Sequence, residues 1–313
     1  MKVLITGGGG FIGLNTAKKF FQLGHEVVLF DMKVDTDRLR SISEDLRFIE
    51  KDIGDLEALT RCFRSENPNV IVHLPALRNL QSQQEPFKAH LVNSTGMVNM
   101  LEAAWRAKVP RVVYASSVAV YGSPAYYRSL NLNPSCVTER MPPNPYNVYG
   151  CTKLYDEMMA FQYGKIYGLT TIGLRISIVF GPGKTLGSKT SEFNDVIESP
   201  FRKEATTINS FGDQKVNLIY LPDVVHGIVC ACLAADPISP VYNLGGYSIT
   251  SRELVDAVRK LQPNAHVSLT ETDQEREVAS AIDISLAKEE LGYEPQLSLE
   301  KSIESHHNTI SNC

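Results

Sequence analysis

The segment Thr6-Gly7-Gly8-Gly9-Gly10-Phe11-Ile12-Gly13 decides the fold of this chain. It follows the apolar run Val3-Leu4-Ile5, which predicts a buried strand, and it opens an amphipathic stretch from Phe11 to Leu23, which predicts a helix. A glycine-rich turn that joins a strand to a helix is the arrangement in which proteins bind the phosphates of a dinucleotide. The context therefore predicts a dinucleotide site at the start of this helix.

The glycines of this turn have separate tasks. Gly7 permits the tight turn, Gly10 lets the backbone approach a pyrophosphate, and Gly13 lets the helix pack closely on the strand. The free N–H groups and the dipole of the helix favour the negative phosphates. We therefore expect cofactor contacts from Gly7, Gly10, Phe11, Ile12 and Gly13.

An acidic residue, Asp31, ends the second apolar run, Val27 to Phe30. An acid about 20 residues beyond such a turn is expected to bond the ribose hydroxyls of the cofactor. Its carboxylate would repel the 2′-phosphate of NADP, so we expect NAD as the cofactor and NADP as the weaker ligand. Lys33 lies close enough to offset this charge in part, although a solvated surface lysine is the simpler interpretation.

Short apolar runs alternate with longer amphipathic stretches through the first 180 residues. Continuous apolar strands separated by helices predict a parallel sheet that is covered on both faces. The sequence therefore predicts an α/β protein with a doubly wound, Rossmann-type sheet.

The pattern changes after Phe180, where a cluster of glycine and proline begins. We expect residues 1–180 to form an NAD-binding domain and residues 181–313 to form a smaller, mixed, substrate-binding domain. Residues 215–238 are predicted to be a strand and a helix that return to the main sheet.

Tyr149 and Lys153 are four residues apart in a predicted helix and therefore share one of its faces. A tyrosine alone is a poor base at neutral pH, because its ordinary pKa is about 10. A nearby ammonium favours the phenolate. Such a pair can accept the proton of a substrate hydroxyl while a hydride leaves the same carbon. The spacing is also common in surface helices, and its position after a dinucleotide site is what favours catalysis.

Two serines, Ser116 and Ser117, follow the apolar strand Val112 to Tyr114. Ligands of an open parallel sheet bind beyond the C-terminal ends of its strands. We expect the Ser117 hydroxyl to hold the reacting oxygen of the substrate, and we expect Ser116 to satisfy local backbone groups.

Composition argues against several other classes of protein. The formal net charge is −4, and no stripe of lysine and arginine predicts nucleic-acid binding. The six cysteines form no CxxC pair and have no histidines at zinc spacing, so we expect no metal site and the reduced thiols of a cytoplasmic protein. No signal-peptide pattern and no apolar run of about 20 residues is present, which predicts no membrane association.

Together these residues resemble the extended short-chain dehydrogenase/reductase superfamily, also called the NAD-dependent epimerase/dehydratase family. The resemblance covers nearly the whole chain, and the family pattern TGxxGxxG matches residues 6–13. It implies a catalytic set of Ser117, Tyr149 and Lys153 that acts on a small-molecule substrate. It also implies cofactor contacts from Asp52, Ile53, Leu74, Ala76, Asn93, Tyr149 and Lys153.

Two positions depart from the pattern of the sugar-nucleotide epimerases in this family. Ile178 stands where those enzymes commonly carry asparagine, and Val216 stands where they commonly carry arginine. An apolar group that faces a desolvated diphosphate is costly. Val118 and Ala119 replace the acid pair of the dehydratase branch, which argues against water elimination. The candidate cations that could replace the lost contacts are Arg78, Arg128 and Lys184.

Three functions compete. The first, which we favour, is an NAD-dependent oxidoreductase that transfers hydride to or from a secondary alcohol or ketone of a sugar-like or small hydroxy substrate. The second is a sugar-nucleotide (UDP-hexose) 4-epimerase, which returns the hydride to the other face. The third is a non-catalytic dinucleotide-binding protein, and the set Ser117, Tyr149 and Lys153 argues against it. Residues 124–145 and 184–215, which are expected to line the substrate pocket, match no recognition code.

The helices predicted over residues 91–107 and 146–167 carry several apolar side chains that can face either the sheet or a second subunit. In the family, the matching helices of two subunits form a four-helix bundle, so the resemblance implies a homodimer. The apolar residues considered for this interface are Met97, Met100, Met158, Met159 and Phe161.

Overall fold

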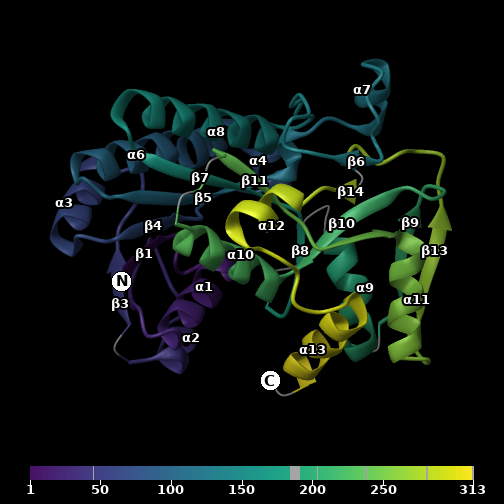
Figure 1. The fold of residues 1–313 in the computed structure, drawn as a ribbon. Helices are drawn as coiled ribbons and strands as arrows, with labels where there is room; N and C mark the ends of the chain where they lie inside the picture. Colours follow the sequence, from purple (N-terminus) through teal and green to yellow (C-terminus); the bar gives the residue numbers. More distant parts are fainter. Residues whose placement is uncertain are drawn as a thin grey trace.

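The computed structural model describes residues 1–44, 46–183, 191–202, 204–235, 237, 239–279 and 281–311. Its largest part is a seven-stranded sheet in which every neighbouring pair is parallel (Figure 1). This is the predicted doubly wound α/β fold. In spatial order the strands are β11 (Val241–Leu244), β7 (Thr170–Ile176), β5 (Arg111–Ser117), β4 (Val70–His73), β1 (Lys2–Thr6), β2 (Glu26–Asp31) and β3 (Arg47–Glu50).

Both faces of this sheet are buried, because successive side chains of a strand point to opposite faces. Val3 and Ile5 pack into the core on one face, whereas Leu4 packs into the core on the other. The first face is covered by α1 (Phe11–Gln22), α2 (Thr36–Ile42), α10 (Leu221–Leu233) and α12 (Ser285–Leu291). The second face is covered by α3 (Leu56–Glu66), α6 (Gly96–Arg106) and α8 (Val148–Tyr167), as Figure 1 shows.

The direction of winding reverses at β1. The chain passes from β1 to β2 and β3 on one side, and then crosses to β4, β5 and β7 on the other. Such a reversal opens a crevice at the carboxyl ends of the strands. The turn after β1 and the loop after β4 meet there, because a Cβ on Gly7 would lie 2.8 Å from the backbone nitrogen of Pro75.

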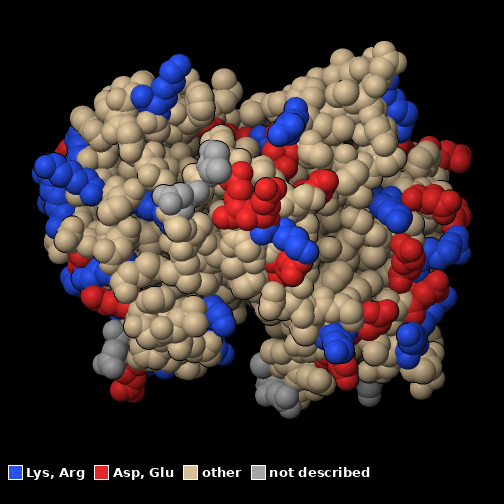
Figure 2. Space-filling view, viewed as in Figure 1, with Lys and Arg blue, Asp and Glu red and all other residues tan. Residues whose placement is uncertain are grey.

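A smaller unit with its own apolar core packs beside the large sheet (Figure 1), and Figure 2 shows the surface of both parts from the same side. It contains a three-stranded sheet in the order β12 (Tyr247–Thr250), β10 (Lys215–Tyr220) and β8 (Ile178–Phe180), and the pair β13 (Val267–Glu271) and β9 (Thr206–Ser210). Its helices are α9 (Ser191–Arg202), α11 (Ser251–Leu261) and α13 (Leu299–Ser311). Another short pair, β14 (Ala281–Ile282) and β6 (Cys136–Val137), brings a late segment against the loops that follow β5. The remaining elements are α4 (Asn79–Gln84), α5 (Pro86–Ala89), a π-helical turn η1 (His90–Thr95), a 3-10 turn η2 (Val118–Val120) and α7 (Pro124–Ser129).

Two strands lie in a different unit from the one predicted. Residues 215–238 do not return to the main sheet as a whole: β10 pairs with β8 and β12, and only α10 lies on the large sheet. Conversely, β11 comes from the stretch 181–313 but forms an edge of the large sheet beside β7. Both strands are short and apolar, so their composition does not encode which sheet they join. Long-range packing makes that choice.

The apolar residues considered for a subunit interface divide between the core and the surface. Met97 and Met100 are fully buried in the core under the sheet, so their assignment to an interface is wrong. They lie three residues apart and therefore occupy one face of α6, and that face is the inner one. Met158 and Phe161 of α8 are instead 61% and 51% exposed. Among the helices described, none combines the length and the apolar character of a membrane span.

Candidate active site

The turn after β1 leaves the start of α1 open to an anionic ligand. Gly7 has a φ of +72°, and its N–H donates to the carbonyl of Phe30 at 2.9 Å. A Cβ on Gly13 would lie 2.3 Å from the carbonyl oxygen of Gly7, so the close packing of helix on turn requires glycine. Gly10 is the N-cap residue and provides no side-chain cap, which leaves N–H groups of the first helical turn for a ligand. Such groups hold the phosphates in dinucleotide sites.

Asp31 lies beside the same turn, at the end of β2. Its carboxylate accepts hydrogen bonds from the N–H groups of Gly9 at 3.0 Å and of Met32 at 2.7 Å. These bonds fix the side chain, and each oxygen retains a further lone pair. The carboxylate can therefore accept a hydrogen bond from a ribose hydroxyl, and its charge opposes a phosphate at that position.

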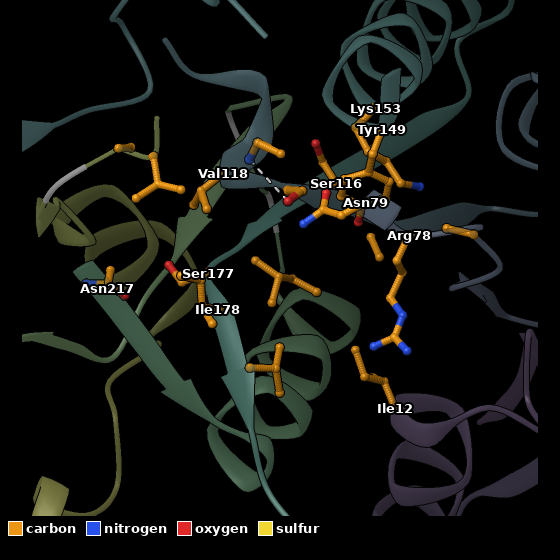
Figure 3. A pocket seen from close by; sticks show the side chains of 18 of the residues that line it. Ile12, Arg78, Asn79, Ser116, Val118, Tyr149, Lys153, Ser177, Ile178 and Asn217 are labelled. Atoms are coloured by element: carbon orange, nitrogen blue, oxygen red, sulfur yellow. Dashed lines mark hydrogen bonds between the residues drawn. The ribbon is translucent and has the colours of Figure 1, made fainter. Parts of the chain in front are cut away.

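A cavity lies between this turn, β5 and α8 (Figure 3). Phe11 and Ile12 of α1 bound it on one side, and Ser117, Tyr149 and Lys153 line it as well. The structure therefore brings the three predicted catalytic residues to one cavity, next to the start of α1. Of the other predicted cofactor contacts, the cavity is lined by Leu74 and Ala76.

Helix α8 lies close to β5 because of two residues at its start. The Asn147 side chain caps the helix and accepts a hydrogen bond from the Gly150 N–H at 2.7 Å. A Cβ on Gly150 would lie 2.2 Å from the carbonyl oxygen of Ala119. Glycine therefore allows the turn that carries Tyr149 to lie against the segment that follows Ser117. The sequence analysis did not identify this role of Gly150.

The hydrogen bond to a local backbone group that was predicted for Ser116 is made by Ser117 instead. The Ser117 hydroxyl accepts a hydrogen bond from the Ala119 N–H at 3.1 Å, so it is Ser117 that satisfies a local backbone group. Ser116 instead donates to the Glu157 carboxylate at 2.5 Å. The expectation for Ser116 was wrong because its partner comes from α8, 41 residues away in sequence. Ser117 nevertheless lines the cavity and can still donate its proton to a ligand.

A buried hydrogen-bond network supports β5 and α8 from behind. The Arg175 guanidinium donates to both carboxylate oxygens of Glu157, at 2.9 and 2.7 Å, and also to the hydroxyl of Tyr121 at 2.8 Å. Tyr121 in turn donates to Asn243 at 2.6 Å. The network thus connects α8, β7 and β11, and charge-assisted bonds of this kind hold side chains in one geometry.

Lys153 is almost completely buried, and its ammonium donates to Oδ2 of Asp156 at 3.2 Å. Burial raises the pKa of the Asp156 carboxyl to about 6, although Lys153 opposes this shift and Glu157 adds to it. On β4, Nδ1 of His73 lies 2.7 Å from the hydroxyl of Thr6. Burial, with the charge of Lys153, lowers the pKa of His73 to about 3, so this ring is neutral at neutral pH.

The two departures from the epimerase pattern lie where the cavity continues outward. Ile178 of β8 lines both the inner cavity and an adjoining outer cavity, and Val216 of β10 lines the outer one. Neither side chain can donate a hydrogen bond to a phosphate. The neighbouring Asn217 amide is engaged by the protein, since it accepts from the Gly246 N–H at 3.0 Å and donates to Ser248 at 3.0 Å.

In the described part of the chain, more acidic than basic side chains line the outer cavity. Glu192, Glu275 and Glu277 line it together with Arg276. Arg276 pairs with Glu192 and donates to the carbonyl of Asn209 at 2.6 Å, so its charge is directed to the protein. Arg276 is the basic residue among the described residues that line the outer cavity, and because it is already paired it does not offer a diphosphate an unpaired cation.

Of the cations proposed to replace the lost phosphate contacts, Arg78 lies at the inner cavity and Arg128 is held in an ion pair. Arg78 lines the inner cavity, and in Figure 3 its guanidinium points toward Ile12. It therefore lies on the side where the cofactor phosphates are expected. Arg128 forms an ion pair with Glu275, with distances of 3.2 and 2.7 Å. Lys184 lies outside the described residues.

Within the described ranges, the predicted cofactor residues that do not line the cavity are Gly7, Gly10, Gly13 and Asp31 around the turn after β1, and also Asp52, Ile53 and Asn93. Asn93 is buried, and its amide donates to the Leu77 carbonyl at 3.0 Å and to the Thr152 hydroxyl at 2.9 Å. It thereby fixes the loop after β4 against α8. Asp52 and Ile53 lie after β3, where Ile53 packs in the core. Their contacts with a cofactor stay predictions.

Several residues that line the inner cavity carried no signal in the sequence. Val278, Ala279 and Ile282 line the cavity from more than 120 positions beyond Tyr149, and no motif marks them. In the described residues, no group of three or more potential metal ligands is arranged to hold an ion. The lining residues that the sequence analysis did not identify include Asn79, Tyr146, Ser177, Val278, Ala279 and Ile282.

The model of the NAD dependent epimerase/dehydratase family matches residues 3–245 of this chain. The chain belongs to that family. This epimerase/dehydratase-family protein is therefore an NAD-dependent enzyme of the extended short-chain dehydrogenase/reductase type.

This chain resembles two proteins described as UDP-glucose 4-epimerases and one that is described in complex with a UDP-sugar acid and NAD. It is 29% identical over 317 residues to a UDP-glucose 4-epimerase of Mycolicibacterium smegmatis, and the match covers 97% of this chain and 96% of that protein. The crystal structure of a UDP-glucose 4-epimerase of Thermotoga maritima with UDP-glucose is 25% identical, with a TM-score of 0.87 and coverage of 100% and 99%. MoeE5 in complex with UDP-glucuronic acid and NAD is 26% identical, with a TM-score of 0.83 and coverage of 100% and 99%.

Proposed function

We propose that this enzyme uses NAD to transfer hydride to or from a secondary alcohol or ketone of a sugar-like or small hydroxy substrate. One observation carries the proposal: Ser117, Tyr149 and Lys153 line a single cavity that also reaches Phe11 and Ile12 at the open start of α1. A dinucleotide whose phosphates lie on α1 can extend into this cavity. A cofactor and a substrate alcohol can therefore meet at the catalytic tyrosine.

The residues of the chain fit this cofactor. Gly13 lets the turn pack against α1, whose start has no side-chain cap, and Asp31 is fixed at the position expected for the ribose. When bound, NAD supplies the acceptor for the hydride. Tyr149 accepts the proton of the substrate hydroxyl, Lys153 favours the phenolate, and Ser117 orients the reacting oxygen.

We favour a dehydrogenase or reductase that acts on a substrate without a nucleotide. Ile178 and Val216 offer no hydrogen bond to a diphosphate, and the arginine that lines the cavity beyond them is paired with Glu192. Each charge-assisted hydrogen bond to a phosphate contributes about 1.5–3 kcal/mol. The loss of two such bonds corresponds to a binding constant that is weaker by roughly two to four powers of ten.

A UDP-sugar 4-epimerase is the second candidate. The similarity to epimerases over nearly the whole chain supports it, since the inner cavity would serve either reaction. In this reaction the hydride returns to the opposite face of the same carbon, and no cofactor is consumed.

Incubation of the protein with NAD and separate polyols, hydroxy acids and UDP-hexoses distinguishes these functions. We expect a net rise in NADH absorbance with a polyol or hydroxy acid, and weak binding of UDP in calorimetry. Micromolar binding of UDP, together with interconversion of UDP-glucose and UDP-galactose and no net NADH, would establish the epimerase instead.

A further inference from the structure

A buried ion pair lies directly behind the catalytic tyrosine. The Lys153 and Asp156 side chains are 3% and 1% exposed, and Nζ of Lys153 lies 3.2 Å from Oδ2 of Asp156. The second carboxylate oxygen, Oδ1, is buried and has no hydrogen-bond partner within the described ranges. A buried carboxylate with only one bonded oxygen is costly for folding, so its presence beside a catalytic lysine calls for a functional reason.

The helix also fixes the position of Asp156 relative to Tyr149. The two residues are seven positions apart on α8, which places them on the same face at a separation of roughly 10 Å along the axis. Lys153 lies between them. The positive charge that favours the Tyr149 phenolate is therefore opposed by a negative charge one turn further along the helix.

The other charged and titratable groups around this pair are contributed by the neighbouring strands and helices. On α8, Glu157 is neutralised by Arg175 of β7. The pKa of Tyr114 on β5 is raised, first by burial and then by Glu157 and Asp156, so this side chain is neutral. His73 on β4 is neutral as well. On α6, the charges of Glu102 and Arg106 cancel in an ion pair. Asp156 thus provides the carboxylate that neutralises the charge of Lys153.

We infer that Asp156 is a positioning residue of the reaction, which anchors the Lys153 ammonium and weakens its pull on the Tyr149 hydroxyl. The inference rests on the proposed role of Tyr149 as the proton acceptor. With the carboxylate ionised, Lys153 and Asp156 together carry no net charge, so Lys153 stabilises a negative charge on the Tyr149 oxygen less than it would alone. The same carboxylate stabilises a positively charged nicotinamide more than a neutral one, so it favours NAD over NADH.

Titration of the Tyr149 phenolate tests this inference without a substrate. The near-ultraviolet absorbance of each variant is compared with that of the same variant carrying Tyr149→Phe, which isolates this tyrosine among the 13 of the chain. We expect Asp156→Asn to lower the midpoint of this titration by about one pH unit. Asp156→Glu, which retains the charge, should restore the wild-type midpoint.

The matched control is Asp256→Asn, which removes an exposed carboxylate from α11. It makes the same change in net charge and should leave the midpoint unchanged. A purely structural role of Asp156 would lower the melting temperature without moving the midpoint. A folded Asp156→Asn protein with the wild-type midpoint would overturn the inference.

A second measurement uses the wild-type protein in case Asp156→Asn does not fold. The ratio of the NADH and NAD dissociation constants is measured by calorimetry at pH values above and below about 6, where the Asp156 carboxyl takes up its proton. We expect the preference for NAD to fall at least about threefold on acidification, because the protonated carboxyl no longer stabilises the positive nicotinamide. A ratio that does not change would contradict the inference. Neither readout needs turnover, so a failure to find a substrate would affect only the proposed function.

Discussion

Tyr149 lies one helical turn before Lys153 and lines the same cavity as Ser117. We predict that Tyr149→Phe lowers turnover by about 100-fold or more, because general acid–base catalysis typically contributes that much. The affinity for NAD should change little, since the phosphates are expected at α1. Steady-state rates and calorimetry with NAD measure the two effects.

The control for this change is Tyr167→Phe, which removes a hydroxyl from an exposed position at the far end of the same helix. It should leave both activity and affinity unaltered. If the Tyr149→Phe enzyme kept more than a tenth of the wild-type rate, the proton-transfer role of Tyr149 would be wrong.

Asp31 determines the cofactor preference that we expect. Its carboxylate is fixed by Gly9 and Met32 at the end of β2, where it can bond a ribose hydroxyl and repel a phosphate. We predict that the wild type binds NAD more tightly than NADP, and that Asp31→Ala moves the ratio of the two affinities at least about tenfold toward NADP. Titration of both proteins with both cofactors measures this ratio. Equal affinities in the wild type would remove the basis of the assignment.

At the scale of secondary-structure elements, the approach of α8 to β5 decides whether the catalytic groups meet. A Cβ on Gly150 would lie 2.2 Å from the backbone oxygen of Ala119, and a backbone atom cannot move aside cheaply. We predict that Gly150→Ala displaces the first turn of α8, lowers kcat/KM by about tenfold or more, and destabilises the protein by about 1–3 kcal/mol. Kinetics and thermal unfolding measure the two losses.

Gly164→Ala is a matched change in the same helix, where the nearest atom to an added Cβ lies 3.3 Å away. Alanine is a better helix former than glycine, and the Leu169 carbonyl oxygen has to shift by only a few tenths of an ångström, so this variant should be as active as the wild type and lose less stability than Gly150→Ala. Equal behaviour of the two variants would show that the close contact at Gly150 has no catalytic consequence.

At the scale of the whole molecule, α8 presents an apolar surface that the chain itself does not cover. Tyr155, Met158 and Phe161 are 42%, 61% and 51% exposed, and Trp105 at the end of α6 is 40% exposed. We expect these side chains to form the interface of a homodimer, which requires roughly 1,000 Å² or more of buried surface. Sedimentation at micromolar concentration should show a dimer of the 34.7 kDa chain.

The double change Met158→Glu and Phe161→Glu should convert that dimer to a folded monomer. Two charges on each subunit would otherwise be buried without partners, which an interface of this kind does not tolerate. A wild type that sediments only as a monomer, or a dimer that survives both changes, would place the interface elsewhere or remove it.

The sequence by itself determined the features that depend on neighbours along the chain. The glycine turn, the acid at the end of β2 and the spacing of Tyr149 and Lys153 are local, because each follows from the geometry of one turn or one helix. The alternation of apolar runs likewise determined the parallel sheet, since a strand buried on both faces needs apolar side chains on both.

Only the tertiary structure decided what depends on groups far apart in sequence. It gave Ser116 a carboxylate partner from α8, assigned β10 and β11 to sheets opposite to those predicted, and lined the cavity with Val278, Ala279 and Ile282. It also placed Asp156 in the interior, where burial changes the chemistry of its carboxyl. The physical reason is common to all of these: hydrogen bonding, strand pairing and desolvation depend on which distant groups share a small volume, and the residue types alone do not specify that choice.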